Sequence, residues 1–384
     1  MQVIQATFGT FHHFHLAHEL NSRGYLKHIY STYPWRRLQR EGVPRDCVST
    51  FPWLHTLQMV TGRYLSIPRS INQATGDFIG TSFDEWLCRR LSACDAYVAL
   101  SGSGMKSGRR AQELGAKYVC DRGSSHVRYQ QQIMLDEYRR WNLPGPQPRR
   151  GAEREEIEYE NSDAITVLSE FARRSFIEYG VPSEKIHTMI LGVQLEAFRQ
   201  TAEPPSDSFE VLFAGSVTFR KGIPYLLEAF RTLQHPRKRL RLVGSVSQEI
   251  RPYLKTQDLR DVEILGSRSQ SELAHTMSES HVLVLPSIED GFGMVMTQAM
   301  ACGCPVISSV NTGGPDVYSH GDEGFIVPIR SPEAILDALQ QLADDPSLRQ
   351  RMSEASLRRV RSLGGWHQYG ENYSNFLRAL CGFN

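Results

Sequence analysis

The residues with the clearest chemical potential lie between Ser280 and Tyr318, in the sequence SHVLVLPSIEDGFGMVMTQAMACGCPVISSVNTGGPDVY. An apolar run at Val282–Leu285 predicts a buried strand, and two carboxylates, Glu289 and Asp290, follow it. A Gly-Phe-Gly loop, a helical pattern, a second short strand and a glycine pair complete the stretch. Glycine loops and a helix N-terminus at the carboxyl edge of a parallel sheet form a cradle for anions, which suits a phosphorylated or nucleotide-linked ligand.

Two adjacent cations, Arg220 and Lys221, follow a predicted strand at Phe209–Ala214 and precede a predicted amphipathic helix at Ile223–Leu233. Fixed cations at a helix N-terminus would neutralise a pyrophosphate and stabilise it as a leaving group. A lone Arg-Lys pair is more often a solvated surface feature. Its place between a strand and a glycine, Gly222, favours the functional interpretation.

Asp290 and Gln298 lie eight residues apart across the junction between loop and helix. A carboxylate in the loop can hold a sugar hydroxyl, and an amide two turns later can bond a ribose. Glycine lets a ligand approach the backbone closely, so the loop Gly291-Phe292-Gly293 could offer peptide N–H groups to phosphate or sugar. Each feature alone would more often be a cap or a turn.

Three histidines stand close together in Phe11-His12-His13-Phe14-His15. No carboxylate or cysteine cluster accompanies them in sequence, so this pattern predicts no metal site. We expect one or two of these histidines, His15 among them, to face a cleft, while Phe11 and Phe14 pack inward at helical spacing. The stretch Ser101–Ser107 lacks the spacing of a phosphate-binding P-loop and predicts a turn lining the cleft, from which Lys106 could meet an acceptor.

The elements that must position these residues alternate between strand and helix in both halves of the chain, which predicts an α/β fold with two parallel sheets. Further strands are expected at 2–6, 97–100, 117–121, 164–168 and 305–309, and a first helix at 11–23. Thr201–Ser208 has the composition of a linker. The pattern predicts two Rossmann-like domains, residues 1–200 and 209–365, facing across a ligand cleft. Residues 366–384 are expected to form a helix that packs back on the first domain, and Tyr33–Arg69 is expected to be an irregular excursion.

Composition and charge narrow the function further. The chain has 384 residues, 22% charged, with a mean hydropathy of −0.37, and seven scattered cysteines typical of reduced thiols. Residues 1–150 hold 20 Lys and Arg against 11 Asp and Glu. This basic half favours an anionic partner or a complementary second domain. Nucleic-acid binding has no supporting motif.

The order FAG…RKG, LVG, LPSIEDGFGMVMTQAMACGCPVI and a glycine pair resembles the family-4 retaining glycosyltransferases, which have the GT-B architecture. The family's two glutamates are matched by Asp290 and Gln298, and Ser216 replaces an arginine that the family often places there. The resemblance implies a donor site in the C-terminal domain. Its residues would be Gly215, Ser216, Arg220, Lys221, Asp290, Gly291, Phe292, Gly293 and Gln298.

In the N-terminal half, the resemblance implies that His126, in the turn Gly-Ser-Ser-His, lies near the acceptor and takes part in catalysis with Arg220, Lys221 and Asp290. Arg122 beside it, and Gly9-Thr10 after the first strand, would contact acceptor or donor phosphate.

The expected activity is transfer of a sugar from a nucleoside-diphosphate donor, a co-substrate, to an anionic or carbohydrate acceptor hydroxyl in glycan, polysaccharide or glycolipid biosynthesis. No cofactor or metal is expected to be required. The protein is expected to be cytoplasmic. The basic and aromatic stretch around Trp35 and Trp53 is most simply a folded loop whose arginines extend to solvent, but it could also rest on the inner face of the membrane or line an acceptor groove. Two alternatives stay open: another GT-B reaction such as nucleotide-sugar epimerisation, and a sugar-nucleotide-binding pseudoenzyme.

Overall fold

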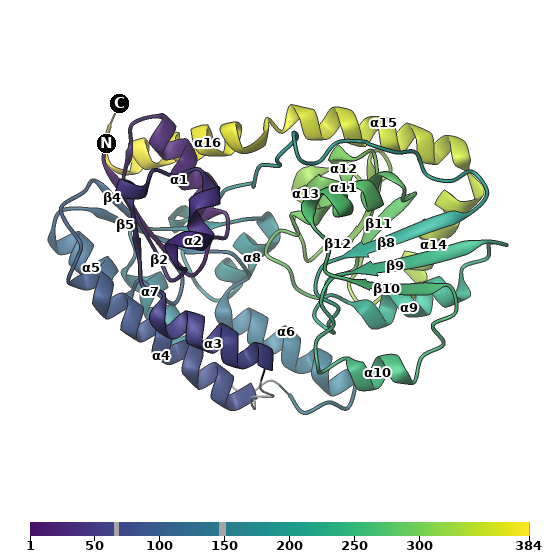
Figure 1. Ribbon diagram of the computed structural model, residues 1–384, viewed down its shortest axis with the longest axis horizontal. Coiled ribbons are helices and arrows are strands. Elements are labelled where there is room, and N and C mark those ends of the chain that lie inside the picture. The colour runs from purple at the N-terminus through teal and green to yellow at the C-terminus, as the bar shows by residue number, and fades with distance from the viewer. Residues whose placement is uncertain (65–68, 146–150, 384) are drawn as a thin grey trace.

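The computed structural model consists of two α/β domains, each built on a parallel sheet (Figure 1). It describes residues 1–64, 69–145 and 151–383, with all side chains in these ranges except those of 60–64 and 69–74. The expected fold class is confirmed.

The N-terminal sheet has the strand order β3-β2-β1-β4-β5-β6-β7, and all its pairs are parallel. Its strands are β1 (Val3–Thr7), β2 (Leu26–Ser31), β3 (Val48–Thr50), β4 (Ala96–Leu100), β5 (Lys117–Arg122), β6 (Ala164–Val167) and β7 (Ile186–Thr188). Its helices are α1 (His13–Ser22), α2 (Trp35–Leu38), α3 (Trp53–Tyr64), α4 (Arg69–Cys88), α5 (Met105–Glu113), α6 (Val127–Arg140), α7 (Ala152–Asn161) and α8 (Glu170–Glu178). Short 3-10 turns occupy Gln39–Glu41, Arg45–Cys47 and Ser183–Lys185.

The C-terminal sheet has the order β10-β9-β8-β11-β12-β13, again with parallel pairs. Its strands are β8 (Phe209–Ala214), β9 (Lys238–Val243), β10 (Val262–Gly266), β11 (Val282–Leu285), β12 (Val306–Ser309) and β13 (Gly324–Val327). The helices that follow them are α9 (Ile223–Thr232), α10 (Arg251–Lys255), α11 (Gln270–Ser278), α12 (Val295–Ala301), α13 (Gly314–Val317), α14 (Pro332–Asp344), α15 (Pro346–Ser362) and α16 (Gly365–Leu380).

The central strands are buried on both faces. In β1, Val3 belongs to one hydrophobic core, whereas Ile4 and Ala6 belong to the core on the opposite face of the sheet. The four residues of β11 are all buried as well. Continuous apolar runs of this kind are typical of parallel sheets covered by helices on both sides.

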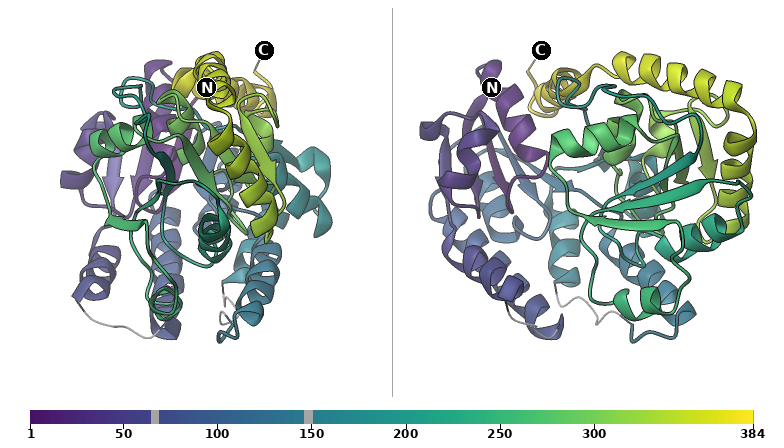
Figure 2. Two further views of the ribbon diagram at one scale, coloured as in Figure 1. Left: turned by 90° about the vertical axis from the view of Figure 1, so that its right-hand side faces the viewer. Right: turned by 45° about the vertical axis from the view of Figure 1, so that its right-hand side comes forward.

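The chain passes between the domains twice. It first crosses after β7, and it crosses back where α15 ends and α16 begins, so that α16 contacts α1 of the first domain. Figures 1 and 2 show α15 and α16 running along one side of the molecule, where both chain ends also lie. Gly192 and Gly365 meet where the two crossings pass, and a Cβ on Gly192 would lie 2.4 Å from the Gly365 carbonyl carbon.

The expectation of an irregular excursion at Tyr33–Arg69 is wrong for most of its length. This region contains α2, β3 and α3, and α4 starts at its end, while residues 65–68 lie outside the described part of the chain. Pro34 and Pro52 immediately precede helices, and proline is well tolerated at a helix start because the first N–H groups have no helical partner. Among the described residues, no helix is both long enough and apolar enough to cross a bilayer.

Candidate active site

The carboxyl ends of the central strands of the two sheets line a shared cavity of ≈ 970 Å³ between the domains. In each sheet this is the edge at which the strand order reverses, between β1 and β4 and between β8 and β11. Open parallel sheets bind their ligands at this place. The residues that line it include Phe8, Phe11, Tyr33, His55, Asp77, Ser101, Gly102, Arg122, Gly123, Ser124, Gln130, Arg154, Glu155, Arg220 and Asp290.

The C-terminal wall of this cavity carries Arg220, one of the two predicted cations, whereas Lys221 next to it in the chain is not among the lining residues. Arg220 and Asp290 both line the cavity, and the Nζ of Lys221 forms an ion pair with Oδ2 of Asp290. Arg220 donates through Nη1 to the carbonyl and carboxylate oxygens of Glu289, at 3.1 and 3.2 Å. The structure therefore brings Arg220, Lys221 and Asp290 together, on loops that follow β8 and β11.

Glu289 is fully buried and joins the two domains. Its Oε1 accepts hydrogen bonds from Ser124 Oγ at 2.8 Å, from Ser125 Oγ at 2.9 Å and from the Ser125 N–H at 3.1 Å. Its Oε2 accepts one from Gln130 Nε2 at 2.9 Å. Burial alone would raise the pKa of this carboxyl group, but Arg220 and these hydrogen bonds lower it to about 2. Glu289 thus stays charged and holds the domains in contact, while Asp290 beside it faces the cavity.

Gly291 also lies at the contact between domains. A Cβ on this residue would be 2.1 Å from the Gly123 carbonyl oxygen and 2.8 Å from the Ser124 Cα. Its own carbonyl accepts a hydrogen bond from Ser169 Oγ at 2.7 Å. Glycine at this position is required by the close approach of the other domain's backbone.

The remaining predicted donor residues surround this point. Gly215 ends β8 with φ +145°, and its N–H donates to the Val243 carbonyl, while Ser216 is exposed. Phe292 is buried, and Gly293 has φ +83°. Gln298 is half-buried in α12, outside the residues that line the cavity.

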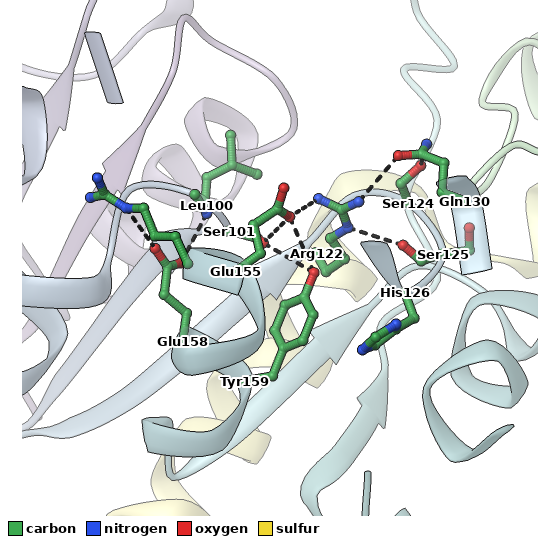
Figure 3. A network of polar contacts seen from close by, with 12 residues as sticks. Leu100, Ser101, Arg122, Ser124, Ser125, His126, Gln130, Glu155, Glu158 and Tyr159 are labelled. Atoms are coloured by element: carbon green, nitrogen blue, oxygen red, sulfur yellow. Dashed lines mark hydrogen bonds and ion pairs between the residues drawn. The ribbon is translucent and has the colours of Figure 1, made fainter. Parts of the chain in front are cut away.

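The N-terminal wall contains a buried polar network centred on Arg122 (Figure 3). Arg122 forms an ion pair with Glu155, donates from Nε to the Ser125 carbonyl at 3.1 Å and from Nη2 to Gln130 Oε1 at 3.3 Å. Burial disfavours the charged form, yet Glu155 raises the pKa of Arg122 above its ordinary value. This network fixes the loop after β5, which carries the partners of Glu289.

His126 lies away from the cavity. Its ring stacks on Tyr179 with centroids 4.8 Å apart and also contacts Tyr159 and Phe176. The Nδ1 atom accepts the Arg128 N–H at 3.2 Å and so caps α6. Burial lowers the pKa of His126 to about 4, and in Figure 3 the ring points away from Arg122. This geometry gives His126 a capping and packing position and does not support the predicted catalytic role.

The loop after β1 lies at the cavity as predicted, but Phe11 is not packed inward and the first helix starts later than predicted. Gly9, with φ +67°, packs against the Tyr33 ring, and the Thr10 carbonyl accepts the Phe14 N–H. Phe14 is buried as expected, whereas Phe11 is 63% exposed and lines the cavity, so its inward packing was predicted wrongly. The helix begins only at residue 13 because Phe11 has φ +40°, outside the helical region.

Two other predicted acceptor residues lie elsewhere. His15 stacks on Trp366 with ring centroids 4.0 Å apart and lines a second groove, at the crossing between the domains. Lys106 forms an ion pair with Glu85 and is not among the residues lining the cavity, although the preceding Ser101 and Gly102 are. Ser101 and Gly102 of the predicted turn thus lie at the cavity, whereas α5 already begins at Met105, so the turn is shorter than the predicted 101–107.

In the folded chain a carboxylate, that of Asp121, lies beside the histidines at positions 12 and 13. Nothing in the sequence indicated this contact. His12 Nε2 lies 2.8 Å and His13 Nε2 3.4 Å from Oδ2 of Asp121, at the end of β5. These three buried residues are the group among the described residues that could hold a metal ion. Asp121 also accepts a hydrogen bond from Thr166, and burial lowers the pKa of His13 to about 3.

Sequence reasoning missed several cavity residues, above all Tyr33, His55 and Arg154. The signal for Tyr33 and His55 was the basic and aromatic character of the stretch that begins at Tyr33, for which an acceptor groove is one interpretation, whereas no pattern indicated Arg154.

Comparisons with known proteins agree with this arrangement. Residues 195–359 match the family model described as glycosyl transferases group 1. The putative colanic acid biosynthesis glycosyltransferase WcaL of Salmonella typhimurium is 26% identical over 197 residues, 48% of each chain. A D-inositol 3-phosphate glycosyltransferase of Streptomyces avermitilis is 30% identical over 225 residues, 52% of this chain and 48% of the relative. The matches thus span about half the length of these curated relatives.

Two solved structures match nearly the whole fold. The Anabaena protein Alr3699/HepE, in complex with UDP, has a TM-score of 0.71 at 14% identity and covers 99% of this chain and 100% of its own. Sucrose-phosphate synthase from Thermosynechococcus elongatus has a TM-score of 0.72 at 20% identity, with 100% of both chains covered. Residues 195–359 are therefore similar to the glycosyl transferases group 1 family, in a chain whose two domains have the GT-B fold.

Proposed function

We propose that the protein is a family-4 retaining glycosyltransferase that moves a sugar from a nucleoside-diphosphate donor to an acceptor hydroxyl, in the synthesis of a polysaccharide or glycolipid. The observation that carries the proposal is that Arg220 and Asp290 line one wall of the cavity, while Lys221, outside the lining residues, forms an ion pair with Asp290. Relatives are named as glycosyltransferases of colanic acid and amylovoran biosynthesis, and a protein of similar fold was solved in complex with UDP; both support the same activity class.

The cations suit a departing diphosphate. Arg220 uses only Nη1 in its contacts with Glu289, and a guanidinium carries five N–H donors, so further donors can meet phosphate oxygens. Lys221 would exchange its partner Asp290 for the diphosphate, which frees the Asp290 carboxylate for a donor-sugar hydroxyl. The positive charges then stabilise the leaving group as its negative charge grows, so the proposal needs no metal for this step.

Retention would follow if the acceptor attacks from the face that the diphosphate leaves, with a phosphate oxygen taking the acceptor proton. Glu289 is not available as a nucleophile, because both of its carboxylate oxygens accept hydrogen bonds within the protein. Gln298 would bond the ribose from α12. Product analysis separates this reaction from epimerisation, which needs no acceptor, and from binding without turnover.

The test is a thermal-shift panel of UDP-, GDP-, ADP- and dTDP-sugars, compared between the unchanged chain and Lys221→Met. A ligand at about 100 times its Kd should stabilise the fold by roughly 2.7 kcal/mol. Lys221→Met should reduce that shift, whereas Lys255→Met, at an exposed position in α10, should leave it unchanged. Absence of a shift with every nucleotide sugar would refute the donor site.

The proposal includes a cytoplasmic location and peripheral contact with an anionic membrane through the region of α3, where Trp53 is 77% exposed. Co-flotation with vesicles containing anionic lipid would test this contact. Equal flotation of Trp53→Ala and the unchanged chain would argue against it.

A further inference from the structure

The N-terminal wall of the cavity combines an aromatic surface with arginines that are already engaged. The aromatic surface consists of Phe8, Phe11, Tyr33 and His55, which all line the cavity. We refer to these four residues as the aromatic wall. Tyr33 and His55 lie with ring centroids 5.2 Å apart, and Phe8 and His55 lie 6.4 Å apart edge to face.

Phe11 is the residue of this wall that is most open to a ligand. Its side chain is 63% exposed although it is a large apolar group. Its backbone has φ +40°, in the left-handed region that a residue other than glycine rarely adopts. Strained backbone positions of this kind persist where the surrounding structure imposes them, and they cluster at ligand sites. The strain here directs an aromatic side chain to the cavity instead of the core where Phe14 packs.

The two arginines of the same wall, Arg122 and Arg154, form hydrogen bonds and ion pairs with other residues of the protein. Each side-chain nitrogen of Arg122 has a partner, in Glu155, the Ser125 carbonyl or Gln130. Arg154 donates from Nη2 to Asp84 at 2.6 Å and from Nη1 to Thr81, and its Nε lies 3.7 Å from Glu158.

Arg220, on the opposite wall, has fewer hydrogen-bonded nitrogens than these arginines and is more exposed to solvent. Its contacts with Glu289 use Nη1 alone, and its side chain is 37% exposed, against 8% for Arg122 and 15% for Arg154.

The other ionisable groups of the N-terminal wall do not add positive charge. Burial, followed by the charge of Arg37, lowers the pKa of His55, which therefore favours the neutral ring. Asp77 adds a carboxylate to the N-terminal wall, which would repel a phosphate, and the charge of Arg122 is balanced by its ion pair with Glu155.

We infer that the acceptor subsite binds an uncharged sugar ring and not a phosphorylated acceptor. The sugar ring would lie against the aromatic wall, with Phe11 as its main contact. The inference rests on the proposed glycosyl transfer and narrows its acceptor. The apolar C–H face of a pyranose matches the flat aromatic surface, while the ring hydroxyls can bond the polar groups beside it. A phosphate would need charge-assisted donors, and every side-chain nitrogen of Arg122 and both terminal nitrogens of Arg154 already have a partner within the protein.

The test measures binding by saturation-transfer NMR, with neutral methyl hexopyranosides and their 6-phosphates as probes. The full chain is used, with and without the nucleoside diphosphate that gives the largest thermal shift. At least one neutral glycoside should bind, and its 6-phosphate should bind no tighter. Phe11→Ala should weaken that binding roughly three- to tenfold, the range expected for loss of one aromatic partner. In transfer assays, KM for the acceptor should rise by the same factor with little change in kcat.

Phe78→Ala is the matched control, because Phe78 is 61% exposed on α4 but does not line the cavity. It should leave glycoside binding unchanged. Three outcomes would overturn the inference: tighter binding of a 6-phosphate by tenfold or more, equal effects of the two substitutions, or no glycoside binding while the nucleotide shift persists. Glycoside binding that depends on Phe11 without any nucleotide shift would support the subsite and refute the proposed transfer function.

Discussion

Replacing Glu289 by glutamine is expected to loosen the contact between the two domains. The carboxylate of Glu289 accepts four hydrogen bonds from the N-terminal domain and pairs with Arg220, and it is fully buried. An amide in its place keeps the shape but removes the charge and turns one acceptor atom into a donor, which would face Gln130 or Arg220. Breaking a buried ion pair by removing one partner costs about 3–5 kcal/mol.

The pKa of Glu289 gives a second figure of the same size. Its value of about 2 in the folded protein lies below the ordinary 4.5. At 1.36 kcal/mol per pKa unit, this corresponds to about 3 kcal/mol in favour of the folded state when the group is ionised. Because the folded pKa is the lower one, this stabilisation is present above pH 4.5 and is lost as the pH falls toward 2.

Hydrogen exchange reports the contact directly, since the Ser125 N–H donates to Glu289 across the interface. A loss of about 3 kcal/mol should accelerate exchange in the peptide that contains Ser125 by roughly a hundredfold. Asp207→Asn is the control, because Asp207 pairs with Arg237 at the surface with both side chains more than half exposed. That pair should contribute little. If Glu289→Gln changed exchange by less than threefold, the assigned role of the carboxylate would be incorrect.

Two further predictions concern backbone approach and pH. Gly291→Ala should separate the domains and abolish sugar transfer, because the new Cβ would lie 2.1 Å from the Gly123 carbonyl oxygen. Gly123→Ala is the control and should be tolerated, since a Cβ on that residue meets no atom within 4 Å. Small-angle scattering would show the opening, and equal behaviour of the two variants would contradict it. The free energy of unfolding should fall as the pH drops from about 6.5 to about 4. Burial lowers the pKa of His13 to about 3 and the pKa values of His126 and His281 to about 4. Below pH 6.5 the unfolded chain therefore binds protons that the folded chain does not, which favours unfolding. The loss should be roughly 1.4 kcal/mol per pH unit for each such ring, and urea unfolding that is independent of pH over this range would refute it.

The central strands were the most predictable part of the fold. Phe209–Ala214 and Val282–Leu285 occur in the structure with the bounds expected from the sequence. Val282–Leu285 is a continuous apolar run ended by Pro286, and Phe209–Ala214 is apolar except for Glu210 and is followed by Gly215; burial on both faces makes such runs distinct. The placement of Arg220 and Lys221 between β8 and α9 followed from the same local pattern.

Contacts between distant segments could not be predicted from one sequence. Ser124 and Glu289 are 165 residues apart, and His12 and Asp121 are 109 apart, yet each pair is hydrogen-bonded. Local spacing also misplaced His126, because a histidine in a glycine-serine turn has the same local sequence whether it faces a ligand or caps a helix. The exposure of Phe11 depends on a single backbone angle that helical periodicity does not encode.

The return of α16 to the first domain has a consequence for synthesis of the chain. The surface of α1 is completed by Gly365–Leu380, so the domain that leaves the ribosome first receives its last helix after the whole second domain has been translated. At roughly 5–20 residues per second, that interval is on the order of ten to forty seconds. During this time the apolar residues of α1 that α16 later covers remain open to chaperones or to neighbouring chains. The amino-terminal domain is therefore expected to mature last.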